Sequence, residues 1–84
     1  MRIRASARKH GIHDEDIRQA LAYARAVSRL EPDEGLARTL LIGPDRAGNL
    51  LELVILHRDS ADDVLIHAMR LRPRYHALLR RHGR

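Results

Sequence analysis

Three short apolar segments follow one another in the second half of the chain, at residues 38–42, 50–56 and 64–69. The links between them, residues 43–49 and 57–63, are rich in Gly, Pro, Asp and Arg. Segments of this length are typical of strands. A parallel crossover needs about a dozen residues or more, so these short links predict an antiparallel meander. A fourth strand over 26–30 would extend it.

Helical patterns flank the predicted sheet. Residues 2–10 predict a short helix that ends at Gly11, a residue suited to the left-handed position after a helix. Residues 14–25 predict a second helix with an acidic first turn, and residues 73–82 a third, because proline fits the first helical position. One side of the first predicted helix carries Ile3, Ala7 and His10, at helical spacing. The expected fold class is therefore α+β, an antiparallel sheet of three to four strands with two N-terminal helices and one C-terminal helix.

Length and composition narrow the function classes. The 84 residues fit a single domain, residues 1–84. The chain has no Cys, which excludes disulfides, thiol catalysis and cysteine-ligated zinc sites. With two Tyr and no Phe or Trp, it lacks the aromatic platforms on which proteins stack nucleic-acid bases. No signal peptide or apolar run of about 18 residues is present, so we expect a cytoplasmic protein with no membrane partner.

Positive charge is concentrated at both ends of the chain. Residues 1–10 contain Arg2, Arg4, Arg8 and Lys9 and no acid, and residues 69–84 contain six arginines and no acid. The two ends carry +10 together, against −5 for the middle. If the fold brings the ends together, they form one basic surface that attracts phosphate backbones or an acidic protein. The alternative is two solvated ends that never meet.

Both faces of the predicted sheet are apolar, so both need a cover. The two N-terminal helices are expected to cover the first face. The second face, which we expect to include Leu65 and Met69, is either a docking surface for another chain or is covered by the C-terminal helix.

Three segments in order carry a family resemblance. They are Lys9-His10-Gly11-Ile12, Arg38-Thr39-Leu40-Leu41-Ile42-Gly43 and Ile66-His67-Ala68-Met69-Arg70. Their order and spacing resemble the BrnT family of type II toxins over roughly residues 5–80. Members of this family are small RelE-like ribonucleases neutralised by a ribbon-helix-helix antitoxin. The family opens with an aromatic-Trp-Asp strand, which this chain lacks, and Ser6 stands where the family often has Asn.

The chemistry of the residues is compatible with such a nuclease. Metal-free RNA cleavage uses the 2′-hydroxyl as nucleophile, and needs proton-transfer groups and cations for the charge that develops on phosphorus. The candidates for proton transfer are His10, His67 and His76, and those for charge stabilisation are Lys9, Arg38 and Arg70. The candidates for RNA binding are Arg2, Arg8, Arg72 and Arg74. We expect no metal and no cofactor, because no spaced carboxylate triad is present.

Structural roles compete with these functional ones. His10 is either a proton-transfer group or a packed helix-end residue, and Tyr75 is expected in the core. Arg38 either contacts RNA or pairs with Glu52 across neighbouring strands. The expected function is that of a ribonuclease toxin with an RNA substrate and a ribbon-helix-helix-type antitoxin as partner. The alternative is a non-catalytic RNA- or protein-binding module with a related fold.

Overall fold

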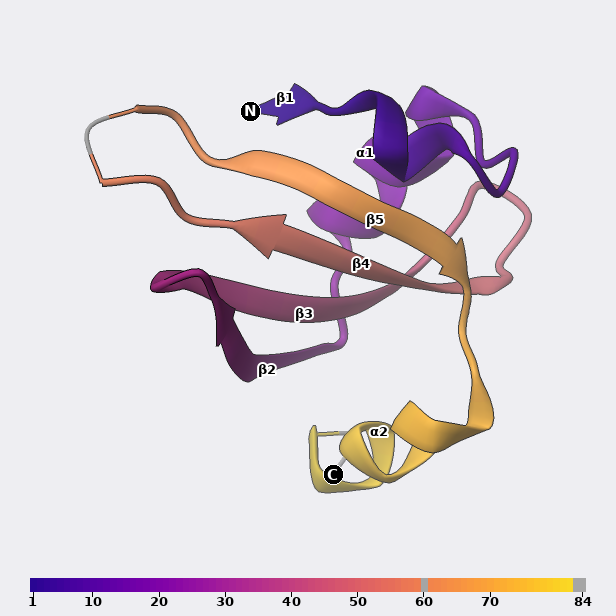
Figure 1. The fold of residues 1–84 in the computed structure, drawn as a ribbon. Helices are drawn as coiled ribbons and strands as arrows, with labels where there is room; N and C mark the ends of the chain where they lie inside the picture. Colours follow the sequence, from indigo (N-terminus) through magenta and orange to yellow (C-terminus); the bar gives the residue numbers. More distant parts are fainter. Residues whose placement is uncertain (60, 83–84) are drawn as a thin grey trace.

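Five strands form one mixed sheet in the computed structural model, which describes residues 1–59 and 61–82 (Figure 1). The strands are β1 (Arg2–Ile3), β2 (Ala26–Asp33), β3 (Leu36–Pro44), β4 (Leu50–Leu56) and β5 (Val64–Arg70). Their order across the sheet is β1-β5-β4-β3-β2. β1 runs parallel to β5, and every other neighbouring pair is antiparallel. The helical elements are the 3₁₀ turns η1 (Ala5–Arg8) and η2 (Pro73–Tyr75), and the helices α1 (Asp14–Ala22) and α2 (His76–His82).

The fold class predicted from the sequence is wrong at the N-terminus. Residues 2–10 do not form a helix: Arg2–Ile3 is a strand and Ala5–Arg8 is a 3₁₀ turn. Pairing with β5 supplies backbone hydrogen bonds instead, such as the one from the Arg4 N–H to the Leu65 carbonyl oxygen at 2.9 Å. A strand therefore stands where a helix was predicted, and the sheet has five strands and is mixed, not antiparallel with three to four strands.

The two other helices are shorter than expected. The helix predicted over 14–25 ends at Ala22, and residues from Ala26 onward join the sheet as β2. The helix predicted over 73–82 begins as the 3₁₀ turn η2 and becomes α-helical only from His76. In both places an alternative hydrogen-bond pattern replaces part of the helix at its end, where helical bonding is weakest.

Strand register assigns the apolar side chains to the two faces of the sheet. Leu40 lies opposite Val54, so it shares a face with Val54 and not with Leu53. A bulge in the pairing of β4 with β5, between Val54 and Ile55, then changes which β5 residues share each face. Leu65 consequently lies opposite Ile55 and is fully buried in the core. Simple alternation of residues along β5 cannot reveal such a bulge.

Helical elements cover both faces of the sheet. α1 and η1 pack on the face that holds the main core, while α2 lies on the other side (Figure 1). The apolar side chains of the second face are buried as well; they are Leu40, Ile42, Val54, Leu56 and Val64. Since Leu65 is fully buried on the core face, it belongs to no docking surface. Met69 does lie on the second face, opposite Glu52, and is half-buried, while α2 packs on β2 and a groove stays open beside it.

α1 packs against β3 with no room for an added carbon at Gly43. A Cβ at this position would overlap the carbonyl oxygen of Ala20 in α1. We expect Gly43→Ala to lower the free energy of unfolding by about 1–3 kcal/mol, because overpacking displaces well-packed elements. Urea unfolding of the variant and the wild type measures this difference. Equal stabilities would contradict the close approach of α1 to β3.

The loop after β3 is tied to the start of α1 by an ion pair. Arg46 donates from its backbone N–H and its Nε to Asp16 Oδ1, at 3.0 and 2.8 Å. These hydrogen bonds lower the pKa of Asp16 to about 2. No helix among residues 1–59 and 61–82 is long and apolar enough to cross a lipid bilayer.

Candidate functional site

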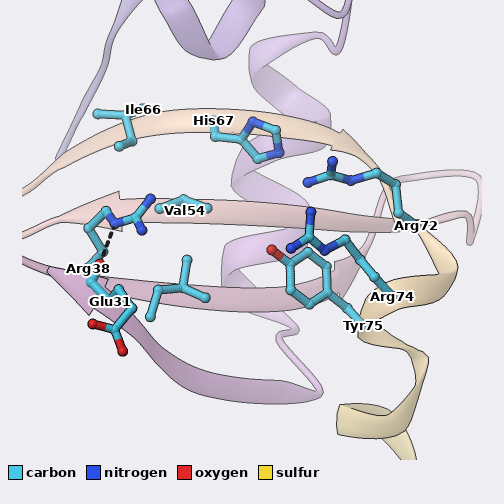
Figure 2. A pocket seen from close by; sticks show the side chains of 9 residues that line it. Glu31, Arg38, Val54, Ile66, His67, Arg72, Arg74 and Tyr75 are labelled. Atoms are coloured by element: carbon cyan, nitrogen blue, oxygen red, sulfur yellow. Dashed lines mark hydrogen bonds between the residues drawn. The ribbon is translucent and has the colours of Figure 1, made fainter. Parts of the chain in front are cut away.

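A groove of about 430 Å³ lies on the second face of the sheet, beside the segment that leads from β5 into α2 (Figure 2). Strands β2 to β5 supply its floor and one end, and the segment around η2 supplies the other. Its lining residues are Leu30, Glu31, Arg38, Val54, Ile66, His67, Arg72, Arg74 and Tyr75. The groove therefore combines an apolar floor with three guanidinium groups and one imidazole.

Glu52 lies behind this lining as a charged residue in an otherwise apolar strand. Its side chain is fully buried. Arg72 donates hydrogen bonds from Nη2 and Nε to Oε2 of the carboxylate, at 2.6 and 3.1 Å. Its backbone N–H also donates to Oε1, at 2.9 Å. His67 Nε2 lies 3.0 Å from Oε2. Two of the lining residues at this end of the groove, His67 and Arg72, are thus held by one buried carboxylate.

The ionised form of Glu52 is stabilised by these contacts. Burial alone would raise the pKa of the carboxyl, but hydrogen bonds from Arg72 and His67 outweigh burial and lower it below its ordinary value. The same hydrogen bonds raise the pKa of Arg72. Glu52 is therefore a carboxylate at neutral pH, able only to accept hydrogen bonds.

Two arginines flank the ring of Tyr75 at this end of the groove. The guanidinium carbons of Arg72 and Arg74 lie 5.7 and 5.2 Å from the ring centroid, within cation–π distance. Pro73 begins η2 between them and fixes the direction of the chain. Tyr75 is half-buried and lines the groove, so the prediction that it lies in the core is wrong.

Arg38 occupies the opposite end of the groove (Figure 2). Its Nε donates to the carbonyl oxygen of Glu31 at 2.8 Å. The predicted cross-strand pair between Arg38 and Glu52 does not form, because Arg38 lies opposite Leu56 in the register and Glu52 lies opposite Ile42. The expectation of that pair is wrong because the register of β3 against β4 is set by the whole hairpin and not by one charge pair.

His10 and His67 come together although they are 57 positions apart in the sequence. Their ring centroids lie 5.8 Å apart in an edge-to-face arrangement. His10 follows η1 and is exposed, so it is not packed on a helical stripe. Because η1 runs beside β5, its C-terminal end brings His10 to the strand that carries His67.

The other residues predicted for the site lie elsewhere. Arg70 lies opposite Leu51 in the register and so belongs to the face with the main core, away from the groove. Arg8 pairs with Asp14, its Nη2 2.9 Å from the carboxylate. The remaining ones are exposed and do not line the groove; they are Arg2, Lys9 and His76. The groove thus gathers Arg38, His67, Arg72 and Arg74 from the predicted set.

The helical part of the basic C-terminal segment lies away from the N-terminal segment, whereas the start of the C-terminal segment follows β5, the strand beside which η1 packs. β1 lies at the β5 edge of the sheet, whereas α2 packs beside β2, the strand at the other edge (Figure 1). Arg8 and Arg72 are each neutralised by an acidic partner. The positive charge of the groove lining therefore comes from Arg38 and Arg74, beside one acidic lining residue, Glu31, and not from a union of the two ends.

Glu52 is the residue of this site that sequence reasoning missed as a functional candidate. A single acid inside the apolar run Leu50–Leu56 is a usable signal, because charged side chains are almost never fully buried unless they are paired. Its partners follow only from the fold, since Arg72 is 20 positions away. Within residues 1–59 and 61–82, no three His, Asp or Glu side chains are grouped so that they could hold a metal ion.

Comparisons with known proteins add no relative. No family model matches the chain, and neither a curated protein nor a solved structure matches it.

Proposed function

We propose that the groove binds the phosphate backbone of RNA and that the protein is a metal-independent ribonuclease, as its resemblance to BrnT-type toxins implies. The observation that carries the proposal is the convergence of His67 with Arg38 and Arg74 on one groove. An imidazole supplies proton transfer near neutral pH, and guanidinium groups stabilise the charge of a phosphorane.

The proposed reaction is an internal transfer at phosphorus. The 2′-oxygen forms a bond to phosphorus, the bond from phosphorus to the 5′-oxygen breaks, and the products are a 2′,3′-cyclic phosphate and a 5′-hydroxyl. One imidazole takes the proton of the 2′-hydroxyl and a second donates a proton to the leaving 5′-oxygen. His67 and His10, with ring centroids 5.8 Å apart, supply these two groups.

Two arginines of the groove are assigned to the phosphate. Arg38 donates a hydrogen bond from Nε to the backbone carbonyl oxygen of Glu31. This bond orients the guanidinium group, and its terminal nitrogens can bind an anion. Arg74 contacts the face of Tyr75. Arg72 is held by Glu52, so we assign it to the wall of the groove and not to the primary phosphate contact.

The biological setting forms part of the same proposal. A ribonuclease of this kind acts in the cytoplasm as a toxin and is neutralised by a ribbon-helix-helix antitoxin, as the resemblance implies. Expression of the chain without such a partner should then arrest growth, and co-expression should restore it.

A non-catalytic RNA-binding module is the second candidate. It is favoured by the engagement of His67 and Arg72 with the same buried carboxylate, an arrangement that also suits a rigid binding surface. Such a module would bind RNA in the groove and leave it intact.

Purified protein incubated with total RNA at neutral pH in the presence of EDTA distinguishes the two candidates. We expect fragments that end in 2′,3′-cyclic phosphate, because His67 in the groove and His10 beside it supply imidazoles, and the arginines supply cations, for attack by the 2′-hydroxyl. RNA that is bound but not cut would favour the binding module. RNA that is neither bound nor cut would contradict both proposals.

A further inference from the structure

We propose that Glu52 is a positioning residue of the groove, which holds His67 through Nε2 so that Nδ1 is the nitrogen that accepts the 2′-hydroxyl proton. This inference rests on the ribonuclease function proposed above. It assigns a role to a side chain that lies behind the lining, and it specifies which atom of His67 acts as the base.

Burial prevents Glu52 from acting on a substrate directly. Its side chain has no exposed surface, and both of its oxygens already accept hydrogen bonds. Oε1 accepts from the backbone N–H and Nε of Arg72, and Oε2 accepts from Arg72 and lies within hydrogen-bond distance of His67. A carboxylate used in this way acts through its partners and not on the reacting atoms.

The bond between Glu52 and His67 fixes the imidazole tautomer. An ionised carboxylate has no proton to donate, so His67 Nε2 must donate across the 3.0 Å contact. A neutral imidazole carries one ring proton, and Nδ1 is then the nitrogen with a free lone pair. The His67 side chain is 23% exposed, which allows access to the ring while Nε2 is anchored.

Arg72 makes this arrangement rigid. Its bidentate contact with Glu52 keeps the carboxylate ionised and in one orientation. Without that contact the carboxylate would be free to rotate or to take up a proton, and the tautomer of His67 would no longer be fixed. Glu52, His67 and Arg72 therefore form one unit that links β4, β5 and the start of η2.

Packing of β4 does not require a charge at this position. The other residues of Leu50–Leu56 are all apolar, and apolar side chains of similar volume often replace buried ion pairs without loss of stability. A role in orienting His67 gives the carboxylate a function that an apolar residue lacks.

The test is Glu52→Gln, followed by ¹⁵N–¹H spectra of the His67 ring at alkaline pH, where imidazoles are neutral. In the wild type we expect the Nε2–H tautomer. In the variant we expect the amide oxygen to take the Oε1 position, because the backbone N–H of Arg72 is a fixed donor there. The amide nitrogen then takes the Oε2 position, displaces Arg72 Nη2 and donates to His67 Nε2, so the tautomer changes to Nδ1–H. The cleavage rate should fall about 10²–10⁴-fold, since the wrong tautomer removes the base, with little change in RNA affinity.

The outcomes separate this inference from the ribonuclease proposal. The wild-type spectrum is informative even if the protein cuts no RNA, and even if the variant does not fold. A wild type with the Nδ1–H tautomer would overturn the positioning role. So would a folded Glu52→Gln protein that keeps the Nε2–H tautomer or cuts RNA at the wild-type rate.

Discussion

His67→Ala should lower the rate of RNA cleavage by about 10²–10⁴-fold, the usual contribution of one general acid or base. His67 lines the groove and is the imidazole held from behind by Glu52. The measurement is the initial rate on a labelled RNA oligonucleotide at neutral pH, with substrate in excess.

His76→Ala is the matched control for this substitution. His76 is an exposed histidine of α2 that does not line the groove, so its removal should leave the rate within a few-fold of the wild type. Equal losses in the two variants would show that the rate responds to the loss of any histidine. In that case His67 would have no particular role in proton transfer.

Arg72→Met should lower the free energy of unfolding by about 2 kcal/mol, because it leaves the buried carboxylate of Glu52 without its main partner. Breaking a fully buried pair costs about 3–5 kcal/mol, and the smaller value reflects the 40% exposure of the Arg72 side chain. Urea unfolding at neutral pH measures the loss. Arg74→Met is the matched control, since Arg74 contacts the same Tyr75 ring but stands apart from the Glu52 hydrogen bonds.

The deficit of Arg72→Met should depend on pH. The pKa of Glu52 is lowered in the folded wild type, so its ionisation stabilises the fold above the ordinary carboxyl pKa. That stabilisation is lost as the pH falls through the lowered value. In the variant, burial without Arg72 raises the pKa of Glu52, so acidification protonates the carboxyl at less cost. The gap between variant and wild type should therefore narrow toward acidic pH, and a gap of constant size would contradict the assigned role of Glu52.

Sequence patterns predicted the strands of the central meander because short apolar runs between turn-rich links leave few alternatives. The segments 38–42, 50–56 and 64–69 all lie within β3, β4 and β5. Helix ends were harder to predict. The stripe over residues 2–10 is compatible with a helix, yet pairing with β5 decides the outcome there, and such tertiary contacts leave no local signal.

The kinds of residue that line the groove could be predicted from the sequence. Which of the candidate residues meet there could not. Arg38 and His67 were among the candidates because their chemistry suits phosphate and proton transfer. Which arginines lie beside them in the groove depends on the bulge next to Val54 and on the turn at Pro73. Neither feature produces a periodic pattern of residues in the sequence. Arg70 was excluded by register alone, since it lies on the opposite face.

A pair of oligonucleotides tests whether the 2′-hydroxyl attacks phosphorus. One is all RNA, and the other carries 2′-deoxy residues at the positions where the first is cut. If the 2′-hydroxyl does attack, we expect the protein to cut the RNA in EDTA, to leave 2′,3′-cyclic phosphate ends and not to cut at the deoxy positions. Cleavage of both oligonucleotides at equal rates, or RNA that stays intact under conditions where it is bound, would contradict cleavage by attack of the 2′-hydroxyl.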